Sequence, residues 1–208
     1  MSNFEILTLV VSGLALIFSL ISLWHQYLSP FKAEIVNSNP VLTVYKVLPK
    51  ISGDKQGKTW WIPSFDVGLS FYNLGQKSGK IIDMRLKAIF KSSKKTQEII
   101  FRPVWIVDYS KFSSKRHQRF QWIEDAVERE WYPLILGPKD KQYIHIIMEG
   151  TRWDKKLPGA IKFEFEIKTS EQKDWHKIER YYVYVIAEMF EGKSCFQSMP
   201  IKTPHLKV

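Results

Sequence analysis

Residues 161–168 read IKFEFEIK, and this stretch indicates the fold class. Ile161, Phe163, Phe165 and Ile167 are apolar, and each residue between them is charged. Successive side chains of a strand point to opposite faces, so strict alternation is typical of a strand with one face on a core and the other in solvent. The stretch therefore predicts a half-buried antiparallel strand.

The same period of two recurs along the chain. Phe65 to Tyr72 alternates, and so does 82–90, where the apolar positions are Ile82, Met84, Leu86, Ala88 and Phe90. Further strands are predicted at 41–48, 98–107, 142–148 and 178–188, and turn signals stand at 73–75, 137–138, 158–159 and 170–174. The strand at 178–188 is apolar on both faces, which predicts a central position. About seven strands in this length favour an immunoglobulin-like antiparallel β-sandwich over residues 41–208.

One segment departs from this period. Phe120, Ile123, Val127 and Trp131 are spaced three, four and four, which predicts a short helix in a long connection, stopped by Pro133. The expected fold class is therefore all-β: an immunoglobulin-like sandwich with one N-terminal transmembrane α-helix and a short helix in a long connection.

The N-terminal prediction rests on residues 6–24, ILTLVVSGLALIFSLISLW, which hold no charge and no proline. A helix of this length spans ~28 Å, close to the ~30 Å hydrocarbon core of a bilayer. Residues 1–28 are expected to form a transmembrane anchor and residues 29–40 a linker. A cleaved signal peptide is the competing interpretation, but the first five residues lack Lys and Arg and no small-x-small cleavage site follows.

The charge distribution predicts the orientation of the anchor. All 31 Lys and Arg residues lie at or after Lys32, and the side with more basic residues tends to stay in the cytoplasm. The single cysteine, Cys195, and the absence of an Asn-x-Ser/Thr sequon agree with a cytoplasmic domain. We expect a single-pass membrane protein with its N-terminus outside and its domain in the cytoplasm.

The formal net charge of +10 favours an anionic partner. Basic residues cluster in predicted connections, at Lys77 and Lys80 and in two larger groups. The two larger groups are predicted to bind anionic lipids if the connections converge on one pole; ordinary solvated loops are the alternative. Nucleic acid is not expected, because no nucleic-acid-binding motif occurs. The predicted residues are Lys91, Lys94, Lys95, Lys111, Lys115, Arg116 and Arg119.

The sequence predicts no catalytic, cofactor or metal site. The five histidines lie at least twenty residues apart, and with one cysteine a sequence-local zinc site has no ligands. His145 could meet Cys195 or an acid in the fold, although a lone histidine on a strand is more often packed or solvated. We therefore expect a protein that is not an enzyme.

The anchor carries a stripe of small residues spaced four, three, four and three: Thr8, Ser12, Ala15, Ser19 and Ser22. This is the 3.5-residue repeat of a left-handed helix–helix interface, and small residues allow close packing in a bilayer. It predicts a homo-oligomer or a membrane-protein partner. In the alternative, the hydroxyl bonds stay within one helix.

These features favour a single-pass, membrane-anchored binding or assembly module that presents a basic domain at the membrane surface. The alternative is an oligomerising membrane effector, such as a toxic or defence component, that perturbs the bilayer.

Overall fold

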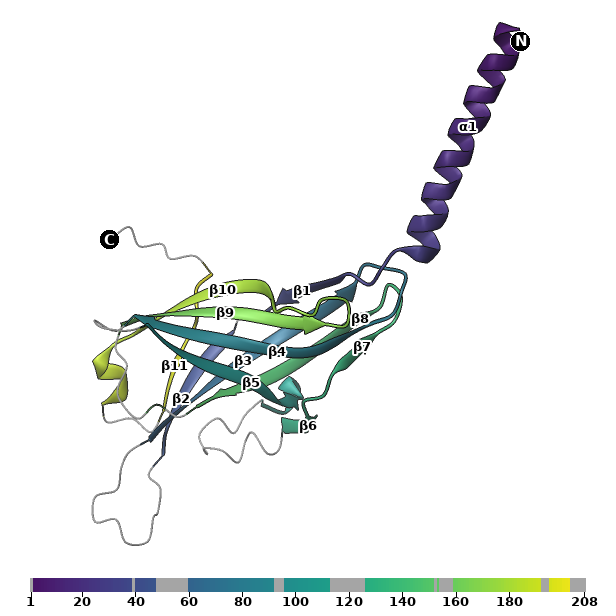
Figure 1. The fold of residues 1–208 in the computed structure, drawn as a ribbon. Coiled ribbons are helices and arrows are strands. Elements are labelled where there is room, and N and C mark those ends of the chain that lie inside the picture. The colour runs from purple at the N-terminus through teal and green to yellow at the C-terminus, as the bar shows by residue number, and fades with distance from the viewer. Residues whose placement is uncertain are drawn as a thin grey trace.

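The computed structural model describes residues 2–38, 40–47, 60–91, 96–112, 126–151, 153, 159–191 and 195–202. One helix and a curled antiparallel sheet make up most of this chain (Figure 1). The helix α1 (Asn3–Leu23) continues into a π-helical turn η1 (Trp24–Leu28). The strands are β1 (Ala33–Asn37), β2 (Val41–Val47), β3 (Trp60–Asn73), β4 (Gly79–Lys91), β5 (Thr96–Val107), β6 (Val127–Glu130), β7 (Leu134–Leu136), β8 (Lys141–Gly150), β9 (Gly159–Thr169), β10 (His176–Val185) and β11 (Cys195–Ser198), with 3-10 turns η2 (Tyr109–Phe112) and η3 (Ala187–Phe190).

The N-terminal helix projects away from the sheet (Figure 1), and none of its residues is buried. Its start is a capping box: the Glu5 backbone N–H donates to Ser2 Oγ, and the Ser2 N–H donates to the Glu5 carboxylate. Asn3–Leu28 contains an 18-residue window with a mean hydropathy of 2.5, so the helix is long and apolar enough to cross a membrane. The predicted apolar N-terminal helix is thus confirmed.

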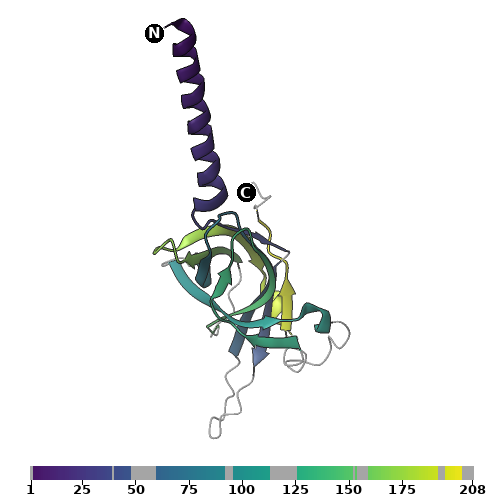
Figure 2. The same cartoon turned by 90° about the vertical axis from the view of Figure 1, so that its right-hand side faces the viewer.

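The described strands form one sheet in the order β10-β9-β4-β5-β8-β3-β2-β11, with β1 beside β3, β6 beside β5 and β7 beside β4. The sheet curls into a half-barrel around its core (Figure 2). Aromatic contacts inside show the curl: Phe65 on β3 lies 5.5 Å from Phe163 on β9, ring centre to ring centre, although three strands separate β3 and β9 in the sheet. The mostly-β prediction is confirmed, whereas the immunoglobulin-like sandwich is not, because the strands make one curled sheet.

Local pairing corrects two details of the predicted strands. A register shift between Ile81 and Asp83 turns the start of β4, so Ile81 is buried and Ile82 is exposed, while Met84 and the later apolar positions face the core as expected. The strand β10, expected to be central, lies at one end of the sheet. Beyond β9, its described pairing is one bridge in which Tyr182 and Ile201 exchange backbone hydrogen bonds.

The predicted helix through Trp131 is wrong at its C-terminal end. Val127–Glu130 forms β6, which pairs with the end of β5, and the Trp131 N–H donates to the Val104 carbonyl. The two described residues of the apolar spacing pack in different places: Val127 packs on a small cluster of Val107, Ala126 and Ile147, and Trp131 packs against the main core. Residues 113–125 lie outside the described part.

Candidate membrane-facing surface

The residues that follow the N-terminal helix form hydrogen bonds with the domain. The Ser29 carbonyl accepts the backbone N–H groups of Gln76 and Lys77 at 3.0 and 3.2 Å, and Ser29 Oγ accepts the Gln76 N–H at 3.1 Å. Three residues further, the Lys32 carbonyl accepts the Leu74 N–H at 2.8 Å. Ser29–Lys32 therefore lies against the β3–β4 turn, and Ala33–Asn37, within the predicted linker, forms a strand.

Two glycines make room for this entry segment. A Cβ on Gly75 would lie 1.8 Å from the Pro30 carbonyl oxygen, and a Cβ on Gly79 would lie 2.1 Å from the Phe31 ring. Both distances are far below van der Waals contact, so a larger residue at either position would displace the segment. Phe31 itself is buried in the main core. The segment after the helix is thus part of the domain's packing.

One buried amide joins three segments at this end of the domain. Asn73, 2% exposed, accepts the Gly75 N–H at 2.9 Å and the Lys32 N–H at 3.4 Å through Oδ1. Its Nδ2 donates to the carbonyls of Lys77 at 2.8 Å and Gly137 at 2.6 Å. We call Ser29–Lys32 together with the turns Asn73–Ser78 and Gly137–Asp140 the junction. A neutral amide that satisfies four backbone groups fixes the junction without using a charge.

The turn between β7 and β8 completes the junction. Lys139 has φ 53°, and its backbone N–H donates to the Gly75 carbonyl at 3.1 Å. Its Nζ donates to the Leu74 carbonyl at 2.5 Å. Asp140 is occupied locally, since its carboxylate accepts the N–H groups of Gly137 and Lys141.

Three exposed lysines lie in or next to the junction and, unlike Lys139, form no side-chain hydrogen bond among the described residues. They are Lys32, Lys77 and Lys80, and we call them the anchor-side lysines. In the part of the chain that the structure describes, none of the three forms an ion pair. The sequence showed Lys77 and Lys80 as a basic pair, but their own pattern did not indicate that they lie beside the helix. The turn Asn73-Leu74-Gly75 is what brings the start of β4 next to Ser29, and its contact with Ser29 could not be predicted from local sequence.

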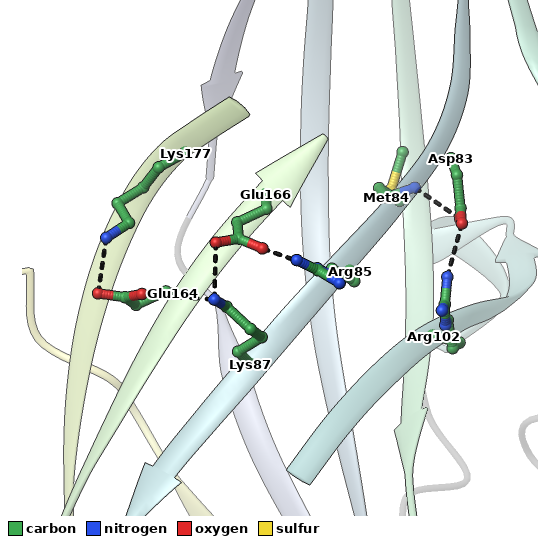
Figure 3. Close-up of polar contacts among 8 residues, drawn as sticks. All are labelled: Asp83, Met84, Arg85, Lys87, Arg102, Glu164, Glu166 and Lys177. Atoms are coloured by element: carbon green, nitrogen blue, oxygen red, sulfur yellow. Dashed lines mark hydrogen bonds and ion pairs between the residues drawn. The ribbon is translucent and has the colours of Figure 1, made fainter. Parts of the chain in front are cut away.

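A second charged region lies on the outer face of β10, β9 and β4 (Figure 3). Glu164 and Glu166 alternate with the core residues of β9, yet both are nearly buried beneath basic side chains. Arg85 and Lys87 approach Glu166 at 2.7 and 3.0 Å. Glu164 lies within 4 Å of Lys162, Lys177, Arg180 and Lys87. We call these seven residues the outer-face cluster.

The electrostatics of the outer-face cluster favour charged glutamates. Burial of Glu164 opposes ionisation, but hydrogen bonds from Lys162 and Lys177 and their charges outweigh it and lower its pKa from 4.5 to about 2. The Arg85 guanidinium also lies 4.1 Å from the ring centre of Trp175, a cation–π contact. These basic groups are occupied within the protein.

The predicted anionic-surface residues do not converge where they are described. Lys91 ends β4 and Lys111 lies in η2, at opposite ends of β5, which are ~36 Å apart at 3.3 Å per residue. Lys111 is exposed and 3.9 Å from Asp108. Lys94, Lys95, Lys115, Arg116 and Arg119 lie outside the described residues.

The predicted stripe lies on the exposed N-terminal helix. Thr8 Oγ1 donates to the Phe4 carbonyl at 2.9 Å, so this hydroxyl is bonded within its own helix. The other stripe residues, Ser12, Ala15, Ser19 and Ser22, are exposed along α1. Self-association stays a prediction.

Of the two partners that the sequence offered for His145, the fold provides the acid. His145 on β8 pairs with the carboxylate of Asp66 on the neighbouring β3. Cys195 is beside Tyr45 and, through it, Ile62, six residues along β3 from the partner of His145, or ~20 Å. The histidine and the thiol therefore do not meet. The described residues contain no group of three or more His, Cys, Asp or Glu that could hold a metal ion.

No family model matches the chain, and no curated protein matches it. Among solved structures it is similar to the "Putative ApaA Protein from Bordetella pertussis", at 10% identity and a TM-score of 0.32, covering 76% of this chain and 97% of that one. It is also similar to a structural genomics target, SoR45, at 10% identity and a TM-score of 0.29, covering 78% and 92%.

Proposed function

We propose that the chain is a single-pass, membrane-anchored binding or assembly module, not an enzyme, that holds its mostly-β domain against the membrane surface. The junction carries this proposal. An apolar helix with no buried residue needs an apolar environment, and the chain follows it straight into a hydrogen-bonded seat on the domain. If the helix served only to bring the domain to a membrane, the residues after the helix would not need to form hydrogen bonds with the domain.

The junction also favours retention of the helix over its removal as a signal sequence. A signal peptidase needs an accessible, extended segment after the apolar run. Here Ser29 is bonded to the β3–β4 turn immediately after η1, and Phe31 is buried in the core. Cleavage close to the helix would have to unseat residues on which the domain packs.

The proposed orientation places the domain in the cytoplasm and the N-terminus outside. It rests on the absence of Lys and Arg before the helix and on Lys32 just after it. Reporter fusions at the C-terminus test it: a fluorescent-protein fusion is expected to fluoresce and an alkaline phosphatase fusion to be inactive. The reverse pair of results contradicts the orientation and leaves the anchor itself in place.

The partner proposed for the helix is a second copy of the chain or another membrane protein, bound through the small-residue stripe. The effector function remains the alternative, in which several copies surround a pore and the stripe lines it. Oligomer size separates the two, because a dimer has no central pore.

Alkaline extraction of membranes tests the anchor. Carbonate strips peripheral proteins, so an anchored chain is expected to stay in the membrane pellet at its full 24.5 kDa. Gly75→Ala serves as a control, because it alters the junction and leaves α1 unchanged, and it should also stay in the pellet. Release of the wild type, or a product shortened by the length of the helix, contradicts the proposal.

A further inference from the structure

We propose that the anchor-side lysines, Lys32, Lys77 and Lys80, bind the anionic headgroups of the bilayer that α1 enters. This inference rests on the proposed function and assigns its lipid chemistry. The proposed lipid-binding surface is the junction, which lies beside the helix in the fold, and not the basic groups around Lys91 and Lys111 that the sequence indicated.

The depth of the junction is set by the helix. Ser29 is five residues beyond Trp24, at most ~7.5 Å along the axis at 1.5 Å per residue. The headgroup layer beyond each side of the hydrocarbon core is ~5–8 Å thick. If Trp24 marks the end of the core, the N–H groups of Gln76 and Lys77, bonded to the Ser29 carbonyl, lie at headgroup level.

The side chains around the junction suit that level. Trp24 and Tyr27 are exposed at the end of the helix, as expected of residues at a membrane interface. Leu74, 40% exposed, adds an apolar side chain on the β3–β4 turn; its N–H donates to the Lys32 carbonyl and its carbonyl accepts from Lys139 Nζ. Apolar groups flanked by lysines match the boundary between acyl chains and charged headgroups.

The charges of these three lysines are available to an outside partner. The basic groups of the outer-face cluster face Glu164 and Glu166, whereas the anchor-side lysines form no ion pair among the described residues. Asp140, the acid in the junction, already accepts two backbone N–H groups. Two exposed acids are also close to this end of the domain: Glu34 on β1, and Glu171, which follows the Ser170 that bonds to Lys80. Neither forms an ion pair with the three lysines among the described residues.

The experiment uses the full chain in phosphatidylcholine bilayers with a trace of spin-labelled phosphatidylglycerol or spin-labelled phosphatidylcholine. Electron paramagnetic resonance measures the fraction of each probe that the protein immobilises. Wild type is expected to prefer the anionic probe at low salt. A lysine near an anionic surface contributes about a fivefold change in affinity, so Lys32→Gln, Lys77→Gln and Lys80→Gln combined should remove the preference.

A matched variant has the same charge change elsewhere: Lys46→Gln, Lys111→Gln and Lys202→Gln, at exposed lysines away from the junction. It should keep the preference. The first triple variant should fold normally, because Lys32 and Lys77 contribute only backbone groups to the hydrogen bonds of the junction.

An unchanged preference in the anchor-side variant, an equal loss in the matched variant, or no preference in the wild type overturns the inference. So does loss of the preference to inorganic phosphate but not to chloride at equal ionic strength, which would mean a site for free phosphate. If neither probe is immobilised by any variant, it is the proposed anchor that fails.

Discussion

The outer-face cluster and the junction are both rich in lysine, but they are held together differently. On β9, Glu164 and Glu166 are nearly buried and each is surrounded by basic groups, so charge stabilises the region and the basic groups are occupied. At the junction, the neutral amide of Asn73 joins three segments, and the anchor-side lysines take no part through their side chains. Lysines that the fold does not use are the ones free to bind something else. Net charge alone cannot separate the two groups.

The largest effect should come from removing the amide at the junction. Asn73→Ala leaves four backbone groups without their partner in a site that is 2% exposed, and we expect a loss of about 3 kcal/mol in the free energy of unfolding. Urea titration of the full chain in detergent, followed by tryptophan fluorescence, measures it. Asn37→Ala is the matched control; its amide donates to the Tyr181 hydroxyl, and we expect a loss of about 1 kcal/mol. A loss at Asn73 no larger than at Asn37 would mean that the amide does not hold the junction.

Removing one acid from the outer-face cluster should come second. Glu164→Gln leaves the surrounding lysines without their counter-charge; because those lysines are partly exposed and can rehydrate, we expect a loss of about 2 kcal/mol. Glu34→Gln, an exposed acid with no described ion pair, should change stability by less than about 0.5 kcal/mol. Similar small effects at both positions would remove the contrast between the two regions.

The same acid gives the outer-face cluster a pH dependence with a definite sign. The pKa of Glu164 is about 2 in the folded protein and 4.5 ordinarily, so the folded state favours the charged form. Its contribution is full above the unfolded pKa and is lost as the pH falls from about 5 towards 2. In Glu164→Gln, the decline in stability over that window should be shallower than in wild type. Parallel curves would contradict the assigned pKa.

The sequence predicted the strands better than their arrangement. The alternation in IKFEFEIK identified β9 and the faces of Phe163 and Phe165, because periodicity is local. It also implied that Glu164 is solvated, whereas long basic side chains from β4 and β10 cover it. How far a sheet curls, and whether β10 lies at its edge, depends on pairings between distant segments. These are not encoded in the period of any one strand.

The junction could not be predicted from the sequence either, because it also depends on contacts between distant segments. Asn73-Leu74-Gly75 was correctly read as a turn, but two of its contacts join it to Lys32 and Gly137, 41 and 64 residues away. The basic groups around Lys91 and Lys111 stood out as local runs of charge. Antiparallel pairing places these two residues at opposite ends of β5, so two runs that looked alike in the sequence do not meet at these positions.

The same change, Lys to Gln, made once in the outer-face cluster and once at the junction compares the two regions directly. Lys87 lies 3.0 Å from Glu166, with its side chain 19% exposed, and Lys87→Gln should cost about 1 kcal/mol in unfolding free energy. Lys77→Gln should change it by less than about 0.5 kcal/mol, because Lys77 binds the junction only through its backbone. Added salt should reduce the difference by screening the Lys87 pair. Urea titrations of both variants at two salt concentrations measure it, and equal costs would show that the anchor-side lysines are structural as well.

The smallest effect concerns pairing of the N-terminal helices. The hydroxyl groups of the stripe favour pairing, whereas the charges of the anchor-side lysines oppose it. The stripe favours association, but hydroxyl contacts between membrane helices are worth only ~0.6 kcal/mol each, and Thr8 already bonds to Phe4. Two packed helices are ~8–10 Å apart, so the anchor-side lysines of two copies would repel each other over about one Debye length. Salt should therefore strengthen pairing of the full chain, measured by energy transfer between labelled copies in nanodiscs. Replacing Lys32, Lys77 and Lys80 by Gln should remove that dependence.

A reporter of transmembrane association that carries only residues 4–26 isolates the stripe, because it lacks all three lysines. Ser12→Leu, Ala15→Leu and Ser19→Leu should each lower its signal, since a large side chain on the stripe keeps the two backbones apart. A signal no higher than that of a monomeric control, or one unchanged by all three substitutions, would show that the stripe is not an interface. In that case any salt-dependent pairing of the full chain must come from the domains. If the reporter responds and the full chain does not pair, repulsion between the lysines outweighs the stripe, and anionic lipid should restore pairing by neutralising them.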